Sequence, residues 1–441
     1  MNSTEINFRK DKLKKLFQVI TENEEEILKA LYSDFKKPAF EGFLTEINVV
    51  KSDLKDAIKN IKSWAKPKKV RASLLNFPSS DYIYSEPYGK TLVISPWNYP
   101  FQLALCPVIV SYAAGNSVVL KPSELTPNTS TLLSKIIRET FDVKEVVAVL
   151  GDADVAKSLL EKRWDYIFFT GSVAVGKEVA KAAAKNLTPV TLELGGKNPC
   201  IIDETANLEV TAKRIVWGKF INAGQTCIAP DYILVQQKVK SKLVRLLKEE
   251  IEKAFGENPQ VSPDFTRIIN KKNWQRLVDM IEEKNVLSGG IFDEENLYIA
   301  PTLIDEPSLE SEIMKEEIFG PLLPILSYTA ENDLKKVISR YEKPLSLYVF
   351  TENKTFTEKI IQDFSFGGGC INDTVVHFSN KRLPFGGVGN SGIGAYHGKK
   401  SYETFSHQKS ILKKATWFDN PIRYAPYKNK LKFIRKLLNW L

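Results

Sequence analysis

Hydrophobic and polar positions follow two different spacings along this chain. Residues 4–64 place apolar side chains such as Leu13 and Leu16 at helical spacing among many charged residues. This pattern predicts two or three amphipathic helices. From 93 to 194, short apolar runs alternate with helical segments instead. Such alternation is typical of a parallel, doubly wound α/β sheet.

The strands expected in this region are short runs rich in apolar residues. Nucleotides bind in the crevice at the carboxyl ends of such strands, so the residues that end them are candidate site residues. We place the strands at residues 93–95, 117–121, 146–150, 166–170 and 191–194.

One uncharged run, residues 91–120, imitates a membrane span. It contains Pro96, Pro100 and Pro107 together with polar side chains, which would interrupt a spanning helix. A buried strand, helix and strand explain this run better.

A second α/β segment is predicted from Gly195 to about residue 390, with a long charged helix over 238–255 and a strand over 345–350. We place the hinge between the two units at Gly195-Gly196. Glu193 and Cys227 would then face one cleft from opposite sides.

The expected domains are a nucleotide-binding domain over 1–194, a catalytic domain over 195–400, a strand over 401–415 and a tail over 416–441. Residues 80–95 read as a hairpin, with strands 81–84 and 90–95 joined through Glu86-Pro87-Tyr88-Gly89. Residues 401–415 are expected to return to the sheet that contains this hairpin.

Bulk composition excludes several classes of protein. A chain of 441 residues with 43% hydrophobic and 26% charged residues is typical of globular proteins with two or three domains. The net charge of +9 comes from 62 basic and 53 acidic residues that are interspersed, so nucleic-acid binding has no support beyond the charge itself. The three histidines lack metal-ligand spacing, so we expect no metal site.

Localisation follows from the cysteines and the first residues. Cys106, Cys200, Cys227 and Cys370 are widely spaced, which fits a reducing compartment rather than a disulfide framework. Residues 1–15 are charged throughout and do not resemble a signal peptide. We therefore expect a cytoplasmic protein.

Cys227 is the candidate nucleophile. It follows the small-residue turn Asn222-Ala223-Gly224-Gln225-Thr226 and precedes a strand, which can present its sulfur to a cleft with backbone N–H groups nearby. The alternative is an inert buried thiol, as for most lone cysteines.

Three further stretches favour the reactive thiol. Glu193 lies between two leucines, where an apolar setting raises a carboxylate pKa toward that of a general base. Asn98 lies in a loop bounded by Pro96 and Pro100, and its amide can face developing negative charge. The loop Glu316-Glu317-Ile318-Phe319-Gly320-Pro321 could hold a ribose and a flat ring.

Together these four stretches resemble the motifs of the aldehyde dehydrogenase superfamily, in that family's order and over about residues 5–415. The short N-terminus and the segment 383–399 resemble its class 3 branch of fatty, aromatic and medium-chain aldehyde dehydrogenases. The resemblance implies oxidation of an aliphatic or aromatic aldehyde to the acid. It also implies a homodimer formed through the hairpin.

The cofactor site is expected at a strand-to-helix turn. Residues 171–177 have the spacing of a phosphate-binding loop, but Glu178 stands where that loop needs a hydroxyl, so an ATPase is excluded. A strand turning through Thr170-Gly171-Ser172 into a helix that contains Val175 could still offer N–H groups to a pyrophosphate. A plain capped helix is the alternative.

The resemblance also assigns cofactor residues. Lys121 and Glu124 match the lysine and glutamate that contact the adenosine ribose, while Glu317 would hold the nicotinamide ribose and Phe319 would pack near the ring. A carboxylate at the ribose favours NAD over NADP, although some class 3 relatives accept both.

Our functional hypothesis is NAD(P)-dependent aldehyde oxidation with Cys227 as nucleophile, Asn98 as oxyanion donor and Glu193 as the base for hydrolysis of the thioester. Glu317 is a second candidate base. Asn372 and the turn Phe385-Gly386-Gly387 are candidates for the substrate side. The rival functions are a noncatalytic dinucleotide binder and a thiol esterase.

The tail differs from the rest of the chain. Apolar residues at helical spacing combine with five basic residues over 428–441. This segment is too short to span a bilayer. It predicts a helix that packs over its own or a partner subunit's cleft, or one that lies on an anionic membrane surface. The apolar positions are Leu431, Phe433, Ile434, Leu437, Leu438, Trp440 and Leu441.

Overall fold

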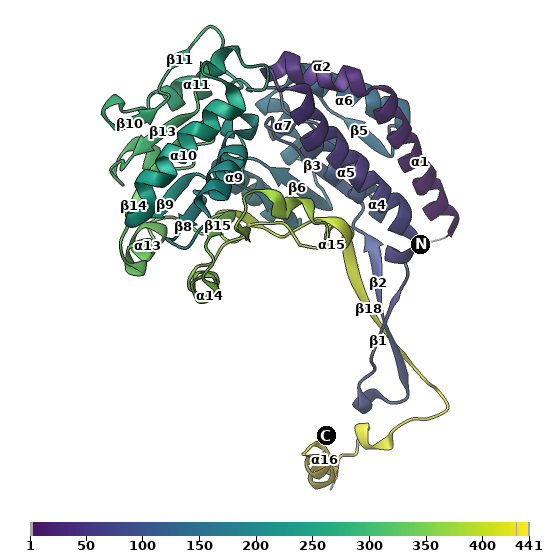
Figure 1. Cartoon of the computed structure of the whole chain (residues 1–441). Coiled ribbons are helices and arrows are strands. Elements are labelled where there is room, and N and C mark those ends of the chain that lie inside the picture. The colour runs from purple at the N-terminus through teal and green to yellow at the C-terminus, as the bar shows by residue number, and fades with distance from the viewer. Residues whose placement is uncertain (1–2, 429, 440–441) are drawn as a thin grey trace.

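Two α/β bodies and an extended arm make up the protein in a computed structural model that describes residues 3–428 and 430–439 (Figure 1). The first body contains the N-terminal helices and the first sheet. The second contains the middle of the chain, and the arm carries the C-terminus away from both. The predicted fold class is confirmed.

The first sheet has six strands in the order β17-β7-β6-β3-β4-β5. Its five longer strands are parallel, and only β17 runs antiparallel. The carboxyl ends of the parallel strands therefore meet at one edge. The strands are β3 (Lys90–Ile94), β4 (Ser117–Lys121), β5 (Val146–Ala148), β6 (Tyr166–Thr170), β7 (Val190–Glu193) and β17 (Gly392–Ile393).

Helices connect these strands as the alternating pattern predicts. Every residue of α5 (Gln102–Ala114) is buried, which explains the long uncharged run as sheet and core helix rather than a membrane span. Ser172 caps the start of α8 (Val173–Ala184), where its hydroxyl accepts a hydrogen bond from a backbone N–H. The remaining connections are α6 (Pro127–Thr140) and α7 (Ala153–Leu160).

The N-terminal helices are α1 (Ser3–Glu22), α2 (Glu24–Phe35), α3 (Ala39–Gly42) and α4 (Asn48–Trp64), with one π-helical turn, Phe43–Ile47, between the last two. Of these helices, α1, α2 and α4 pack against this body through apolar faces that form a common core with α5.

A second sheet has seven strands in the order β10-β13-β14-β9-β8-β15-β16. All neighbours are parallel except the pair β10 and β13. The predicted long helix is α10 (Gln237–Phe255). The strands are β8 (Pro199–Ile202), β9 (Tyr232–Gln236), β10 (Val286–Ser288), β13 (Thr302–Asp305), β14 (Leu322–Tyr328), β15 (Ser346–Phe350) and β16 (Gly368–Ile371).

The chain crosses between the two sheets where the hinge was predicted. β7 of the first sheet ends at Glu193, and β8 of the second sheet begins at Pro199. The chain returns at β17, where Gly392 pairs with Glu193 in the first sheet. The second domain was predicted to continue to residue 400. Within that range, however, β17 belongs to the sheet of the first body.

The arm corrects the predicted hairpin. β2 (Ser79–Pro87) pairs with β1 (Lys68–Val70) and with β18 (Ser406–Lys414), whereas the next strand, β3, lies inside the first sheet. Residues 81–84 and 90–95 are thus strands, but not partners of one another. Of the residues 401–415 that were predicted to return to the sheet of β2, residues 406–414 do so as β18, whereas 401–404 belong to the helix α15 (Gly398–Thr404).

The tail forms the helix α16 (Lys430–Leu438) beyond the arm, away from both bodies (Figure 1). Packing of this helix over its own cleft, one of the predicted alternatives, is therefore wrong, because the arm holds it far from the edge of the sheets. The predicted apolar positions Trp440 and Leu441 lie outside the described residues. No helix within residues 3–428 and 430–439 is long and apolar enough to cross a membrane.

Candidate active site

A left-handed backbone turn presents Cys227. Asn222, Ala223 and Gly224 have φ angles of 55°, 51° and 73°, and such values are unusual for Asn222 and Ala223, which are not glycines. A Cβ on Gly224 would lie 2.3 Å from the carbonyl oxygen of Gly320, so only glycine fits there. Local strain of this kind is typical of functional sites.

Hydrogen bonds hold both sides of this turn. The Gln225 amide donates to the carbonyl oxygen of Asn222 at 3.1 Å and accepts from the N–H of Ile269 at 3.0 Å. The Asn198 amide donates to the carbonyl oxygen of Cys227 at 2.8 Å, and its oxygen accepts from the N–H of Ser346 at 2.8 Å. The turn that carries the thiol is therefore fixed by residues of the second α/β body.

Two cavities meet at the thiol. The larger, of about 570 Å³, is lined by the turn after β6 and by the loop that contains Glu317 and Phe319. The smaller, of about 280 Å³, has a mostly apolar wall. Both are lined by Leu103, Thr170, Glu193, Leu194 and Cys227. A reacting atom in either cavity can thus reach the sulfur.

Glu193 is an unpaired carboxyl in this junction. Its side chain is 3% exposed, and neither carboxylate oxygen has a hydrogen-bond partner. Burial raises the pKa of Glu193 well above its usual value. A buried polar group without a partner is rare in native proteins and calls for an explanation, and catalysis is one of the accepted ones.

The Cys227 thiol has a raised pKa, chiefly because it is desolvated and secondarily because Glu317 and Glu193 lie nearby. The backbone N–H groups of Cys227 and Ile228 act in the opposite direction, because they stabilise the thiolate.

Asn98 lies beside the thiol in the larger cavity. Its side-chain nitrogen donates to the carbonyl oxygen of Gln225, two residues before Cys227, at 3.1 Å. A primary amide has two N–H donors, so one remains to face the cavity. The structure therefore brings Asn98, Glu193 and Cys227 to one place, as the sequence predicts.

Five of the predicted cofactor residues line the larger cavity: Thr170, Gly171, Ser172, Glu317 and Phe319. The first turn of α8 also faces it through Val173 and Ala174, whose N–H groups have no partner within the helix. A helix N-terminus of this kind suits a pyrophosphate. The residues present thus fit a dinucleotide.

Glu317 and Phe319 occupy the other wall of this cavity. A Cβ on Gly195 would lie 1.9 Å from Oε2 of Glu317, so the hinge glycine lets this carboxyl approach. Burial and Asp231 raise the pKa of Glu317 to about 8, while the N–H of Gly196 opposes the shift. The rings of Phe319 and Trp97 pack edge-on, with 5.4 Å between their centroids. Both aromatic side chains line the cavity.

The remaining predicted cofactor residues stand apart. Lys121 ends β4 at the same edge of the sheet and forms an ion pair with Glu124 at 3.0 Å, but neither lines the cavity. The Val175 side chain is exposed, and only its N–H takes part, donating to the Ser172 hydroxyl at 3.4 Å. The adenosine end of the site is thus less enclosed than the rest.

The substrate side contains residues that the sequence did not reveal. Leu44, Thr45 and Asn48 reach the smaller cavity from the N-terminal helices, and Trp217 reaches it from α9 (Leu208–Phe220). Nothing in the amphipathic pattern of residues 4–64 marks them as site residues. Of the predicted turn Phe385-Gly386-Gly387, Phe385 lines this cavity, whereas Gly386 and Gly387 do not.

Asn372 does not line the smaller cavity, although it was a candidate for it. Its amide instead exchanges hydrogen bonds with the backbone of Thr351 at 2.8 Å, so its role is to tie two strand ends together. Within the described residues no group of three or more histidine, cysteine, aspartate or glutamate side chains could hold a metal ion.

Comparison with known proteins adds independent findings. The profile of the aldehyde dehydrogenase family matches residues 1–411. The chain is similar to 4,4'-diaponeurosporen-aldehyde dehydrogenase of Staphylococcus aureus, with 48% identity over 98% of this chain and 94% of that protein. It is also similar to the dimeric NADP-preferring aldehyde dehydrogenase of Mus musculus, with 44% identity over 97% of this chain and 94% of that protein.

A solved structure of the substrate-bound state of Staphylococcus aureus AldH has the same fold. It superposes with a TM-score of 0.95 at 47% identity, covering 98% of this chain and 95% of that one.

Proposed function

The chain belongs to the aldehyde dehydrogenase family, whose members oxidise aldehydes with NAD(P). We propose that Cys227, Asn98 and Glu193 perform this oxidation here. The observation that carries the proposal is the meeting of an apolar cavity and a dinucleotide-sized cavity at the Cys227 sulfur.

The first step is addition of the Cys227 thiolate to the aldehyde carbonyl carbon. A C–S bond forms, and the carbonyl electron pair moves to oxygen. The free N–H of Asn98 and the backbone N–H of Cys227 then hold this oxyanion. Bound NAD(P)+ supplies the oxidising power by accepting a hydride.

Cys227 carries a thioester after the oxidation. Glu193 takes a proton from water as the water attacks the thioester carbon, and the C–S bond breaks to release the acid and restore the thiolate. The unpaired oxygens of Glu193 support this role, because they leave room for a water molecule as hydrogen-bond donor. Glu317, whose carboxyl approaches the hinge glycines, is assigned to the cofactor ribose instead.

The substrate we propose is an apolar aldehyde, either aliphatic with a medium or long chain or aromatic. The wall of the smaller cavity supports this class, because Leu44, Trp217 and Phe378 face it. The name of the Staphylococcus aureus relative, 4,4'-diaponeurosporen-aldehyde dehydrogenase, also gives an aldehyde as the substrate of that protein.

The function is tested by the absorbance of the reduced cofactor with wild-type protein, an aliphatic aldehyde series and benzaldehyde, each with NAD+ and NADP+. We expect turnover that improves as the aliphatic chain lengthens from acetaldehyde. Ester hydrolysis without any nicotinamide, and no reduction with any aldehyde, would favour the thiol esterase. Cofactor binding without either activity would favour a binding protein.

The oxyanion role predicts a large effect of Asn98→Ala. Loss of one such donor typically lowers kcat by roughly 10²–10³-fold. The measurement is the steady-state rate of cofactor reduction at saturating aldehyde. Asn116→Ala is the matched control, since Asn116 is equally buried and hydrogen-bonded but lies outside both cavities. Equal rates for Asn98→Ala and Asn116→Ala would remove Asn98 from the mechanism.

We also propose a homodimer formed through the arm. Exposed apolar side chains support it, among them Leu74, Phe77 and Leu412 on the arm, and the Mus musculus relative is named as dimeric. The helix α16 would then pack on the partner subunit, with an anionic membrane surface as the alternative contact in a cytoplasmic, membrane-associated protein. Sedimentation velocity should give twice the mass of one chain, and a species of 49.9 kDa would contradict the dimer.

A further inference from the structure

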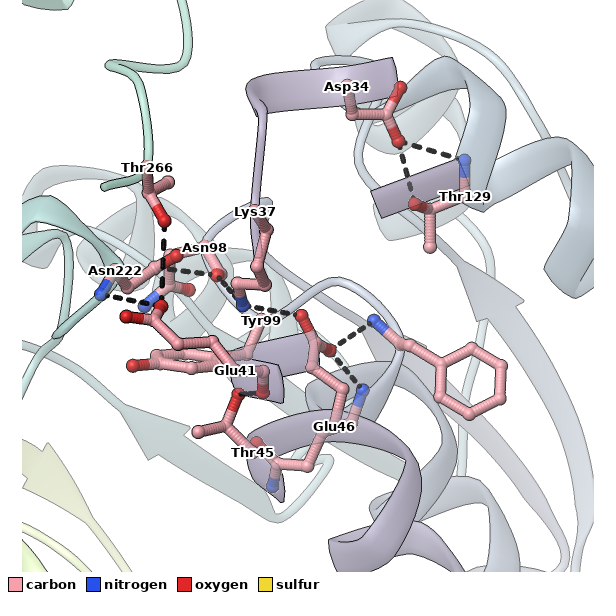
Figure 2. Close-up of polar contacts among 12 residues, drawn as sticks. Asp34, Lys37, Glu41, Thr45, Glu46, Asn98, Tyr99, Thr129, Asn222 and Thr266 are labelled. Atoms are coloured by element: carbon pink, nitrogen blue, oxygen red, sulfur yellow. Dashed lines mark hydrogen bonds and ion pairs between the residues drawn. The ribbon is translucent and has the colours of Figure 1, made fainter. Parts of the chain in front are cut away.

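A fully buried ion pair lies behind the proposed oxyanion donor. Lys37 follows α2 and Glu46 lies in the π-helical turn, and their side chains are both completely inaccessible to solvent. The ammonium nitrogen of Lys37 lies 2.7 Å from Oε1 of Glu46 (Figure 2). Desolvating two charges is costly, and apolar residues of similar volume often give a more stable core. The contacts of this pair therefore deserve a functional explanation.

Each member of the pair has a second contact, and both contacts are on the loop that carries Asn98. The Lys37 ammonium donates to the backbone carbonyl oxygen of Asn98 at 3.3 Å. The other oxygen of Glu46 accepts from the N–H groups of Phe101 and Gln102, both at 2.9 Å. Glu46 thereby caps α5, the helix that begins where this loop ends.

The same carbonyl of Asn98 is joined to the turn that presents the thiol. The Asn222 side chain donates to this oxygen at 2.9 Å and to the carbonyl oxygen of Gln225 at 3.1 Å. The Asn98 side chain donates to the same Gln225 oxygen at 3.1 Å. The contacts of Lys37 and Asn222 with the Asn98 carbonyl oxygen fix the backbone of Asn98. They thereby set the direction of its remaining side-chain N–H.

A third residue of the N-terminal segment contacts the thiol turn directly. One carboxylate oxygen of Glu41, in α3, accepts from the backbone N–H of Asn222 at 3.0 Å (Figure 2). Asn222 is one of the residues with left-handed backbone. Residues 37–46 therefore hold two parts of the site. Lys37 and Glu46 contact the loop that carries Asn98, and Glu41 contacts the turn before Cys227.

We propose that Lys37 and Glu46 are positioning residues for the oxidation, which aim the Asn98 amide at the oxyanion by fixing the Asn98 carbonyl and the start of α5. Neither side chain lines either cavity, so neither contacts substrate or cofactor. This inference rests on the proposed function, because it assigns the pair a role through Asn98.

The first variant is Lys37→Met, which keeps the apolar stem and removes the ammonium. We expect the single-turnover rate of NADH formation to fall roughly tenfold, since a misplacement of about 1 Å in a catalytic group can cost up to 10²-fold. KM for the aldehyde should change little, because the apolar cavity remains intact.

The double variant Lys37→Met/Glu46→Gln separates positioning from stability. It removes both charges of the Lys37–Glu46 pair, so its melting temperature should recover relative to Lys37→Met. The contact with the Asn98 carbonyl stays lost, and we therefore expect the rate to stay low. Recovery of the wild-type rate together with stability would overturn the proposal. This variant also serves if Lys37→Met alone fails to fold.

A cycle with Asn98→Ala shows whether the effect passes through this residue. In the Asn98→Ala background, Lys37→Met should lower the rate little further, whereas independent effects would multiply and contradict the inference. Lys240→Met is the matched control. It breaks ion pairs with Asp305 and Glu306 outside both cavities and should leave the rate unchanged.

The outcomes also distinguish this inference from the function on which it rests. If Asn98→Ala retains the wild-type rate, the proposed oxyanion role itself fails, and the positioning role fails with it. If Asn98→Ala is slow while Lys37→Met is not, the oxyanion role stands and only the positioning role is overturned.

Discussion

Cys227→Ser is expected to lower aldehyde oxidation by roughly 10³-fold or more, because a serine hydroxyl is a far weaker nucleophile than a thiolate. The rate of cofactor reduction at saturating aldehyde is the measurement. The variant should still bind the dinucleotide, because the side chains that line the larger cavity are otherwise unchanged. Quenching of tryptophan fluorescence measures this binding.

Cys370→Ser is the matched control for this variant. Cys370 is the other cysteine that is not fully buried, and it lies on β16 outside both cavities. Its replacement should leave the rate unchanged. Retained activity in Cys227→Ser, or its loss in Cys370→Ser, would show that the nucleophile has been misidentified.

The sequence predicted those elements whose signal is local. β4 and β6 occupy the predicted residues, because runs such as Tyr166–Thr170 are rich in apolar residues and are followed by turn residues. The crossing between the sheets was equally visible, since Gly195 and Gly196 lie between a strand of the first sheet and one of the second. In each case, neighbouring residues alone decide the structure.

Strand pairing is not a local property, and here the prediction was wrong. β2 and β3 are consecutive and joined by a short turn, which favours a hairpin. In the structure, however, Glu86 pairs with His407, more than 300 residues away, and Leu92 lies between neighbours of the first sheet. The burial of β3 on all sides decides its partners, and burial depends on the whole fold.

The residues of the candidate site also differ in whether the local sequence reveals them. Asn98, Glu193 and Cys227 could be found because each lies in a short stretch of distinctive composition. Lys37 and Glu46 could not, since two charges within an amphipathic helical region are ordinary in sequence. Only the packing of α2 and the π-helical turn against the Asn98 loop makes them buried and gives them their contacts.

Glu193→Gln is expected to stop the reaction after the oxidation. Without the base, water attacks the Cys227 thioester slowly, and removal of a general base typically costs roughly 10²–10⁴-fold. NADH formation should therefore show a burst of one equivalent per active site followed by very slow turnover. Mass spectrometry of the intact protein should find the acyl group on Cys227.

The pH dependence gives a second signature of this base. Burial raises the pKa of Glu193, so the carboxylate that can accept a proton becomes more populated as pH rises. Thioester hydrolysis by the wild type should accelerate with pH above the usual titration range of a carboxyl group, and this acceleration should disappear in Glu193→Gln.

Glu317→Gln discriminates between the two carboxyl groups at the junction. With Glu317 on the cofactor ribose, its variant should raise KM for the nicotinamide cofactor and show no burst, because hydrolysis still has Glu193. If Glu317→Gln instead accumulated the thioester while Glu193→Gln turned over normally, the roles would be exchanged. The two carboxyls differ in one respect that favours our assignment: Glu317 interacts with the N–H of Gly196, whereas both oxygens of Glu193 are free to receive a proton from water.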